Sequence, residues 1–264
     1  MDHAGAHPGL TAAGNAGDWV WSDVRATHEP CGVRLRHAHE DAELFVERGR
    51  LRAGRGYADA APAARRSLAR VGAVVRLRER GRYLLHASGV VDLLGRAWIL
   101  LGDSGSGKST LAYALAREGW AALGDDGVLV EPTRGGIAVH AWRDPLLVSR
   151  TLDREFPELR GREAEQAGDP RQRVAMSTPV ARRAPLAGLL LLERTAVRGL
   201  PPAPVTAAEA LLELVRQSPW VALGDDRSRA HLVALAIVGR TPAWRLPNGA
   251  GRPATLARDL EALA

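Results

Sequence analysis

A glycine-rich loop around one lysine has the residue types of a phosphate-binding site. The loop runs from Gly102 to Thr110 and reads GDSGSGKST, with Lys108 near its end. The chain has 36 basic residues, and every one except Lys108 is arginine. A compact ammonium can lie under phosphate oxygens as a point charge, which a planar guanidinium cannot imitate. The retained lysine therefore supports a phosphate-binding role at this position.

The segments on both sides of the loop are those that such a site requires. Residues 97–101 are an apolar run typical of a buried strand, and residues 108–117 have apolar positions at helical spacing. The glycines let the backbone N–H groups turn inward, the helix start adds its positive dipole end, and Ser109 can offer its hydroxyl to Mg²⁺. The candidate nucleotide-binding residues are Gly102, Asp103, Ser104, Gly105, Ser106, Gly107, Lys108, Ser109 and Thr110.

Two adjacent carboxylates follow the next apolar segment. Asp125 and Asp126 begin 17 residues after Lys108. In a parallel sheet we expect them beside the loop, where one carboxylate would hold Mg²⁺ and the other would accept a proton from an attacking hydroxyl. A surface Asp-Asp-Gly turn is the structural alternative. The combined pattern favours phosphoryl transfer.

Several short motifs together resemble the catalytic core of the HPr kinase/phosphorylase family. They are HASGV at 86–90, WILL at 98–101, the glycine-rich loop, EGW at 118–120 and GDD at 124–126. The nearer likeness is to the shorter HPr-kinase-related kinases of peptide-modification systems, including lasso-peptide tailoring kinases. The resemblance is strong over about residues 82–131. It implies an α/β fold with an HPr-kinase/PEP-carboxykinase-like P-loop core, a mixed sheet with helices, and ATP and Mg²⁺ as cofactors.

The resemblance also implies roles for individual residues. Lys108 and its loop would bind the ATP phosphates, and Ser109 would meet Mg²⁺. Within the aspartate pair, Asp125 is expected to be the base and Asp126 the metal-facing carboxylate. His86 matches a family histidine near the active site, with a buried strand histidine as the alternative. These roles predict a kinase that phosphorylates a serine-type hydroxyl of a protein or peptide.

Other features leave alternatives open. Thr110 stands where HPr-specific kinases have glutamate, and neither the signature stretch that follows the aspartate pair in bifunctional enzymes nor their N-terminal regulatory domain is found. These departures do not support HPr as acceptor, and they leave a phosphorylase back-reaction open. Glu193 ends the apolar run 189–192 in a Walker B outline, which would suit a regulatory ATPase, and a kinase of a small hydroxylated metabolite also stays open. The sequence lacks a guanine-reading N-K-x-D and an ABC-type signature. Candidate charge clamps for the transition state are Arg143, Arg150, Arg171 and Arg173.

The spacing of apolar residues, together with turn and capping residues, predicts the domain boundaries and the remaining helices and strands. Residues 1–60 are expected to be an extension with short strands within 18–24, 31–37 and 43–51, with the first 18 or so residues disordered, and residues 61–264 the kinase domain. A linker is expected over 54–62 and helices over 64–75, 228–238 and 253–263; a capping box at Thr206 and Glu209 opens another. Further strands are expected over 82–91, 120–123, 128–130, 186–192 and 243–246.

The near-repeat WAALGDD and WVALGDD, ending at Asp126 and Asp226, is interpreted as coincidence because the flanking sequences differ.

Composition limits the possible partners and environments. The net charge is +6, but the arginines are interspersed with acids and no zinc-finger or RNP signature is present, so nucleic acid is not expected as a partner. No secretory signal and no apolar run long enough for a membrane span is found, and the single cysteine, Cys31, excludes an intramolecular disulfide. We expect a cytoplasmic protein without membrane contact. A homo-oligomer stays open.

Overall fold

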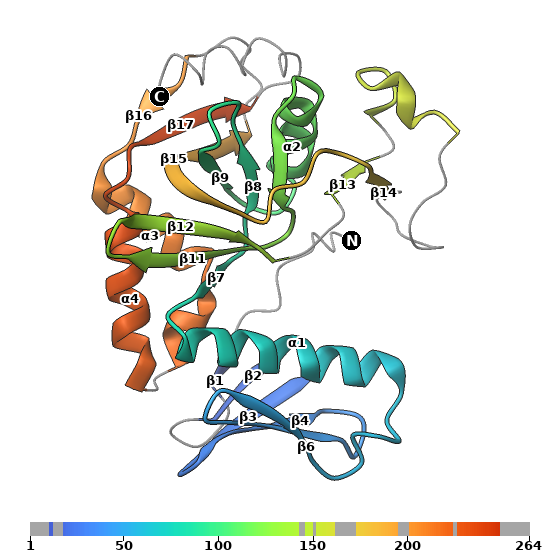
Figure 1. Ribbon diagram of the computed structural model, residues 1–264. Coiled ribbons are helices and arrows are strands. Elements are labelled where there is room, and N and C mark those ends of the chain that lie inside the picture. Colours follow the sequence, from blue (N-terminus) through green and yellow to red (C-terminus); the bar gives the residue numbers. More distant parts are fainter. Residues whose placement is uncertain are drawn as a thin grey trace. The chain divides into compact units, whose positions relative to one another are not determined.

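The chain folds into two compact units, as seen in a computed structural model (Figure 1). The structure describes residues 11–12, 18–142, 146–149, 152–161, 173–194, 201–223 and 226–248. Unit 1 comprises residues 1–84 and 218–235, and unit 2 comprises residues 85–217 and 236–264. The helix expected over 253–263 and the side chains of Arg143, Arg150, Arg171 and Arg173 lie outside the described residues. No helix of the described segments has the length and apolar character needed to cross a membrane.

Unit 1 is built on a six-stranded antiparallel sheet in which each strand pairs with the next in sequence. Its strands are β1 (Thr11–Ala12), β2 (Asp18–Trp21), β3 (Val24–Glu29), β4 (Gly32–His37), β5 (Glu43–Glu47) and β6 (Arg50–Ala53). Alternate residues such as Val24, Leu35 and Val46 are fully buried, which is the pattern of a sheet with one face covered. A strand lies within each of the ranges predicted over 18–24, 31–37 and 43–51, but β3 was not predicted, and a turn divides the range 43–51 into β5 and the start of β6.

Helix α1 (Pro62–Glu79) covers the apolar face of this sheet (Figure 1). It packs on β4 and β5 through buried Leu68, Val71 and Val75, which confirms the predicted amphipathic helix. Residues 61–84 therefore group with the N-terminal strands, whereas the sequence placed a boundary at residue 60. The short helix η3 (Pro219–Leu223) and most of α4 (Asp226–Val238) also belong to unit 1, where Trp220 packs edge-on against Trp21 at 4.5 Å.

Unit 2 contains a mixed sheet with the order β10-β8-β9-β15-β12-β11. These strands are β8 (Ser88–Val91), β9 (Ala97–Leu101), β10 (Ala121–Gly124), β11 (Val128–Thr133), β12 (Gly136–Ala141) and β15 (Arg183–Arg194). The long β15 runs parallel to β9 and to β17 (Ala243–Asn248), which also pairs with β16 (Ala203–Pro204). The α/β class with a mixed sheet is confirmed.

The remaining elements complete the described part of the chain. They are β7 (Tyr83–Leu85), α2 (Lys108–Arg117), the paired strands β13 (Leu146–Ser149) and β14 (Arg173–Met176), η2 (Pro157–Leu159) and α3 (Ala207–Arg216). The predicted capping box is present at α3: Thr206 Oγ1 accepts from the Glu209 N–H, and the Glu209 carboxylate accepts from the Thr206 N–H. The strand expected over 82–91 is interrupted at residues 86–87, between β7 and β8.

The sequence suggested that the strand before the aspartate pair, β10, lies directly beside β9. In the structure the antiparallel strand β8 separates them. β8 lies between β9 and β10 and is antiparallel to both. As a result β9 and β10 point the same way and end at the same edge of the sheet, and β8 begins at that edge. The aspartate pair is thus close to the glycine-rich loop although its strand is not the neighbour of β9, and this arrangement brings the start of β8 into the site.

A buried carboxylate organises the turn between β8 and β9. Asp92 accepts hydrogen bonds from the Leu94 and Arg96 N–H groups, the Arg96 guanidinium and the Trp98 indole. Burial alone would raise the pKa of Asp92, but the bonds from Arg96 and Trp98 outweigh it and hold the pKa below the usual aspartate value. Trp98 in turn packs against Trp120 and Trp244 in the core of unit 2. Asp92 therefore couples the turn to the core.

We expect Asp92→Asn to lower the free energy of unfolding at neutral pH by about 1–3 kcal/mol, because an amide cannot accept all of these bonds. Since the folded-state pKa is lowered, the stabilisation by the carboxylate is complete above the usual aspartate pKa and is lost as the pH falls through the folded-state pKa. Urea unfolding at neutral and acid pH measures both effects, with the exposed Asp41→Asn as control. A constant difference between wild type and variant down to acid pH would contradict this account.

Candidate active site

The glycine-rich loop joins β9 to α2 with a backbone that only glycine fits at two positions. Gly102 has φ +138°, and a Cβ there would lie 2.6 Å from the Leu192 carbonyl oxygen. Gly107 has φ +95° in the left-handed region and is the N-cap of α2. Both conformations strongly disfavour other residues. The predicted strand, loop and helix are confirmed with the expected bounds, and the loop N–H groups lie at the positive end of α2.

Lys108 is the first residue of α2 and folds back over the loop. Its ammonium donates to the carbonyl oxygens of Gly102 at 2.7 Å and Asp103 at 3.1 Å, and the residue is 8% exposed. Burial lowers the pKa of Lys108, although the negative charges of Asp126, Asp125 and Asp103 counteract the shift. Phosphate oxygens would be stronger acceptors for this ammonium than peptide carbonyls.

Asp125 connects three elements at the edge of the sheet. One carboxylate oxygen accepts from the Ser88 hydroxyl at 2.7 Å and the Ser109 hydroxyl at 2.8 Å. The other accepts from the Leu147 N–H at 3.0 Å. Ser88 opens β8, Ser109 belongs to the first turn of α2, and Leu147 lies in β13. Asp125 is only 4% exposed, so these bonds replace the water that a buried carboxylate has lost.

Asp126 adopts a different environment from its neighbour. Its φ of +58° turns the backbone into the left-handed region, which aspartate tolerates better than most residues. Its carboxylate lies 3.1 Å from Nδ1 of His86, and its side chain is 44% exposed while that of His86 is 14% exposed. The two aspartates are therefore unlike: one is buried among hydrogen-bond donors, and the other is open to solvent beside an imidazole.

An open pocket of about 500 Å³ collects these groups, all of which belong to unit 2. The predicted residues that line it are His86, Ser104, Gly105, Gly107, Lys108, Ser109, Thr110, Asp125 and Asp126. Three predicted loop residues do not line it: Gly102 supplies a carbonyl to Lys108, Asp103 pairs with Arg216 at 2.9 Å, and Ser106 is buried. The structure thus brings most of the expected site together.

Further residues of the pocket were not identified from the sequence. They are Leu147, Ser149, Leu152 and Arg194 in the lining, and Ser88 behind Asp125. The sequence signals for them were the membership of Ser88 in the HASGV motif and the place of Arg194 directly after Glu193, whereas the position of Ser88 at a strand start appears only in the structure. Glu193 itself pairs with Arg245 at 3.3 Å and is not a lining residue, although β15 does lie beside β9.

The donor set fits a small hard cation. Within the described segments, no group of three or more His, Cys, Asp or Glu side chains could hold a metal by itself. The Ser109 hydroxyl and the Asp125 carboxylate nevertheless present two oxygens 2.8 Å apart at the pocket. Mg²⁺ commonly takes one or two protein oxygens and completes its shell with phosphates and water. Ser109 and Asp125 would suffice for Mg²⁺ bound together with a nucleotide.

Comparison with known proteins gives little beyond these observations. No protein-family model and no curated protein sequence matches the chain. Among solved structures, the HPr(Ser) kinase/phosphatase from Coxiella burnetii is similar with a TM-score of 0.38 and 14% sequence identity. The match covers 68% of this chain and 89% of that chain. A likeness at this level does not establish a shared activity.

Because the loop is expected to bind ATP phosphates, we expect the affinity for ATP to fall as the pH is raised toward the usual lysine pKa, since burial lowers the pKa of Lys108 and its ammonium must be charged to bind phosphate. The fall should begin below the usual lysine pKa. Calorimetric titration with ATP across this range measures it. In Lys108→Arg the affinity should be weaker but nearly constant with pH, since a guanidinium stays charged throughout. A wild-type affinity that does not change with pH would argue against the contact between Lys108 and phosphate.

Proposed function

We propose that the protein is a phosphotransferase that moves the γ-phosphoryl group of ATP to a serine-type hydroxyl of a protein or peptide. The observation that carries the proposal is the meeting of Lys108, the Ser109–Asp125 pair and the Asp126–His86 pair in one pocket at the start of α2. Together these groups supply a cation for phosphate, oxygens for Mg²⁺ and an accessible carboxylate for a proton. Phosphoryl transfer needs little more than such positioning and charge.

Different residues of the pocket are proposed to bind phosphate, to stabilise charge and to accept the proton. The loop N–H groups and Lys108 hold the phosphates. Arg194 lines the same pocket, and its guanidinium would stabilise charge on the transferring group. When bound, Mg²⁺ would neutralise charge on the β- and γ-phosphates. The acceptor oxygen forms the new bond to phosphorus as the bond to the ADP oxygen breaks, and the hydroxyl proton passes to a carboxylate.

The two aspartates are proposed to have the opposite roles to those expected from the sequence. Both oxygens of Asp125 already accept hydrogen bonds, and its contact with Ser109 favours the metal side. In P-loop proteins the loop serine or threonine and a nearby aspartate hold Mg²⁺ together. Asp126 is open to solvent and lies beside His86, so it can reach an incoming hydroxyl. We therefore propose Asp126 as the base and His86 as the residue that positions its carboxylate.

The proposed roles predict different defects for two matched variants. Asp125→Asn should raise the Mg²⁺ concentration for half-maximal activity by about tenfold or more, because a charged metal-side group is lost. Asp126→Asn should lower kcat by about a hundredfold or more with an unchanged Mg²⁺ requirement, because the proton acceptor is lost. Initial rates measured against Mg²⁺ concentration separate the two. The reverse pattern would restore the assignment made from the sequence.

The proposed reaction is tested with labelled ATP and a set of serine-containing peptides and proteins. We expect label on an acceptor, and a loss of transfer of more than about tenfold in Lys108→Arg because the phosphates are no longer positioned correctly. Glu193→Gln should leave transfer unchanged, since Glu193 is paired with Arg245 outside the pocket lining. Release of inorganic phosphate alone, abolished by Glu193→Gln but unaffected by the aspartate variants, would identify a regulatory ATPase instead. Label on a small hydroxylated metabolite would change the acceptor class.

A further inference from the structure

The last strand of the unit 1 sheet presents a free edge. β6 is hydrogen-bonded only to β5, and all four of its residues are exposed. The two-residue turn at Arg48 and Gly49 makes Glu47 and Arg50 the first paired residues, so Arg50 and Arg52 direct their backbone groups toward β5. Leu51 and Ala53 then direct their N–H and C=O groups outward. In the part of the chain that the structure describes, no strand pairs with this edge.

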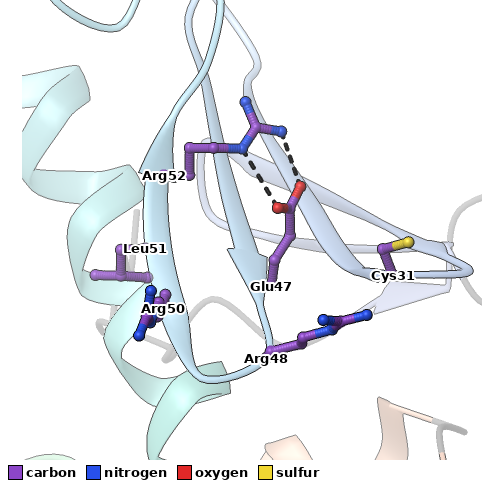
Figure 2. A pocket seen from close by; sticks show the side chains of 6 residues that line it. All are labelled: Cys31, Glu47, Arg48, Arg50, Leu51 and Arg52. Atoms are coloured by element: carbon purple, nitrogen blue, oxygen red, sulfur yellow. Dashed lines mark hydrogen bonds and ion pairs between the residues drawn. The ribbon is translucent and has the colours of Figure 1, made fainter.

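An arginine-rich pocket of about 830 Å³ lies beside this edge (Figure 2). It is lined by Cys31, Glu47, Arg48, Arg50, Leu51 and Arg52, all of unit 1. The side chain of Leu51 points toward α1, where it approaches the Gly72 position. The lining thus combines three guanidinium groups with one carboxylate, next to exposed backbone donors and acceptors.

The single carboxylate of the pocket is already engaged. Arg52 donates two hydrogen bonds to Glu47, at 2.8 and 3.3 Å (Figure 2). Its guanidinium also lies over the Phe45 ring at 4.3 Å. The bonds from Arg52 lower the pKa of Glu47, so the glutamate stays ionised and paired. Arg48 and Arg50 make no ion pair with any described residue. The net charge available to a partner is therefore positive.

The positive charge of this edge disfavours a second copy of β6 as its partner and favours an acidic strand. Two copies of β6 laid side by side would bring arginines together, which opposes pairing between identical chains. A strand that carries carboxylates at alternate positions would instead be attracted to this edge. Its acids would face the arginines while its backbone pairs with Leu51 and Ala53. Addition of a strand to a sheet edge is a common mode of peptide recognition, in which main-chain bonds give affinity and side-chain pockets give specificity.

We propose that the β6 edge, residues Arg50–Ala53 with the adjoining pocket, binds an acidic peptide segment in extended conformation as an added strand. Its carboxylates would pair with Arg48 and Arg50, and its backbone would bond to the outward groups of Leu51 and Ala53. The proposal concerns unit 1 alone and does not depend on phosphoryl transfer in unit 2. The peptide can belong to a substrate or to another partner.

Binding can be measured on the full chain with a fluorescent peptide of about ten residues that alternates glutamate and valine. We expect anisotropy to show binding that weakens by about tenfold or more between about 0.05 and 0.5 M salt. The double variant Arg48→Glu with Arg50→Glu should weaken binding by about tenfold or more. The control Arg66→Glu changes an exposed arginine of α1 and should have little effect. Equal binding of a peptide with lysine in place of glutamate would overturn the proposal.

A second pair of experiments tests the added strand itself. Ala53→Pro removes an outward N–H while leaving the bonds to β5 in place, so it should weaken binding by about tenfold with an unchanged melting temperature. A peptide N-methylated at alternate residues tests the same bonds without altering the protein. If the charge variants weaken binding but neither the methylated peptide nor Ala53→Pro does, attraction is only electrostatic and the proposed strand pairing is wrong.

Discussion

The site in unit 2 depends on one buried carboxylate, that of Asp125, and on the three donors that satisfy it. A carboxylate at this depth is costly unless its lost water is replaced, and here two hydroxyls and one backbone N–H replace it. Each donor comes from a different element, so the same bonds fix the relative positions of β8, α2 and β13. The geometry of the pocket is therefore a consequence of solvating one charge, and a change at any of the three donors would disturb the other two.

In the pocket without ligand, the positive and negative side chains are equal in number. Lys108 and Arg194 supply two cations, and Asp125 and Asp126 supply two carboxylates. Burial disfavours the charged form of Lys108, while the aspartates favour it. An anionic nucleotide accompanied by a divalent cation would add its charge to a site that is already nearly neutral, so the loop N–H groups and the dipole of α2 provide the remaining stabilisation. This balance explains why the cations and acids have to be placed together rather than in separate patches.

Local sequence signals predicted the elements but not their order in the sheet. Residues 97–117 were predicted to within a residue, because the apolar run, the glycines and the helical spacing agree with one another. The place of β8 between β9 and β10 could not be predicted, since strand order is decided by long-range packing rather than by neighbouring residues. That order brings Ser88, at the start of β8, to Asp125 at the end of β10. The interpretation of the near-repeat as coincidence is confirmed: in WAALGDD the apolar residues form β10, whereas in WVALGDD they form η3.

The contrast between lysine and arginine that marks the sequence has a structural counterpart in each unit. Arg52 donates two hydrogen bonds to Glu47 and stacks over Phe45, and both contacts require a planar, multidentate group. Lys108 instead places a single nitrogen between two carbonyl oxygens in a space where the residue is 8% exposed. A guanidinium there would need room for its full plane and for the donors that face away from the loop. The one position that keeps lysine is thus the one where a compact charge is required, and arginine serves where the surroundings offer paired oxygens or an aromatic face.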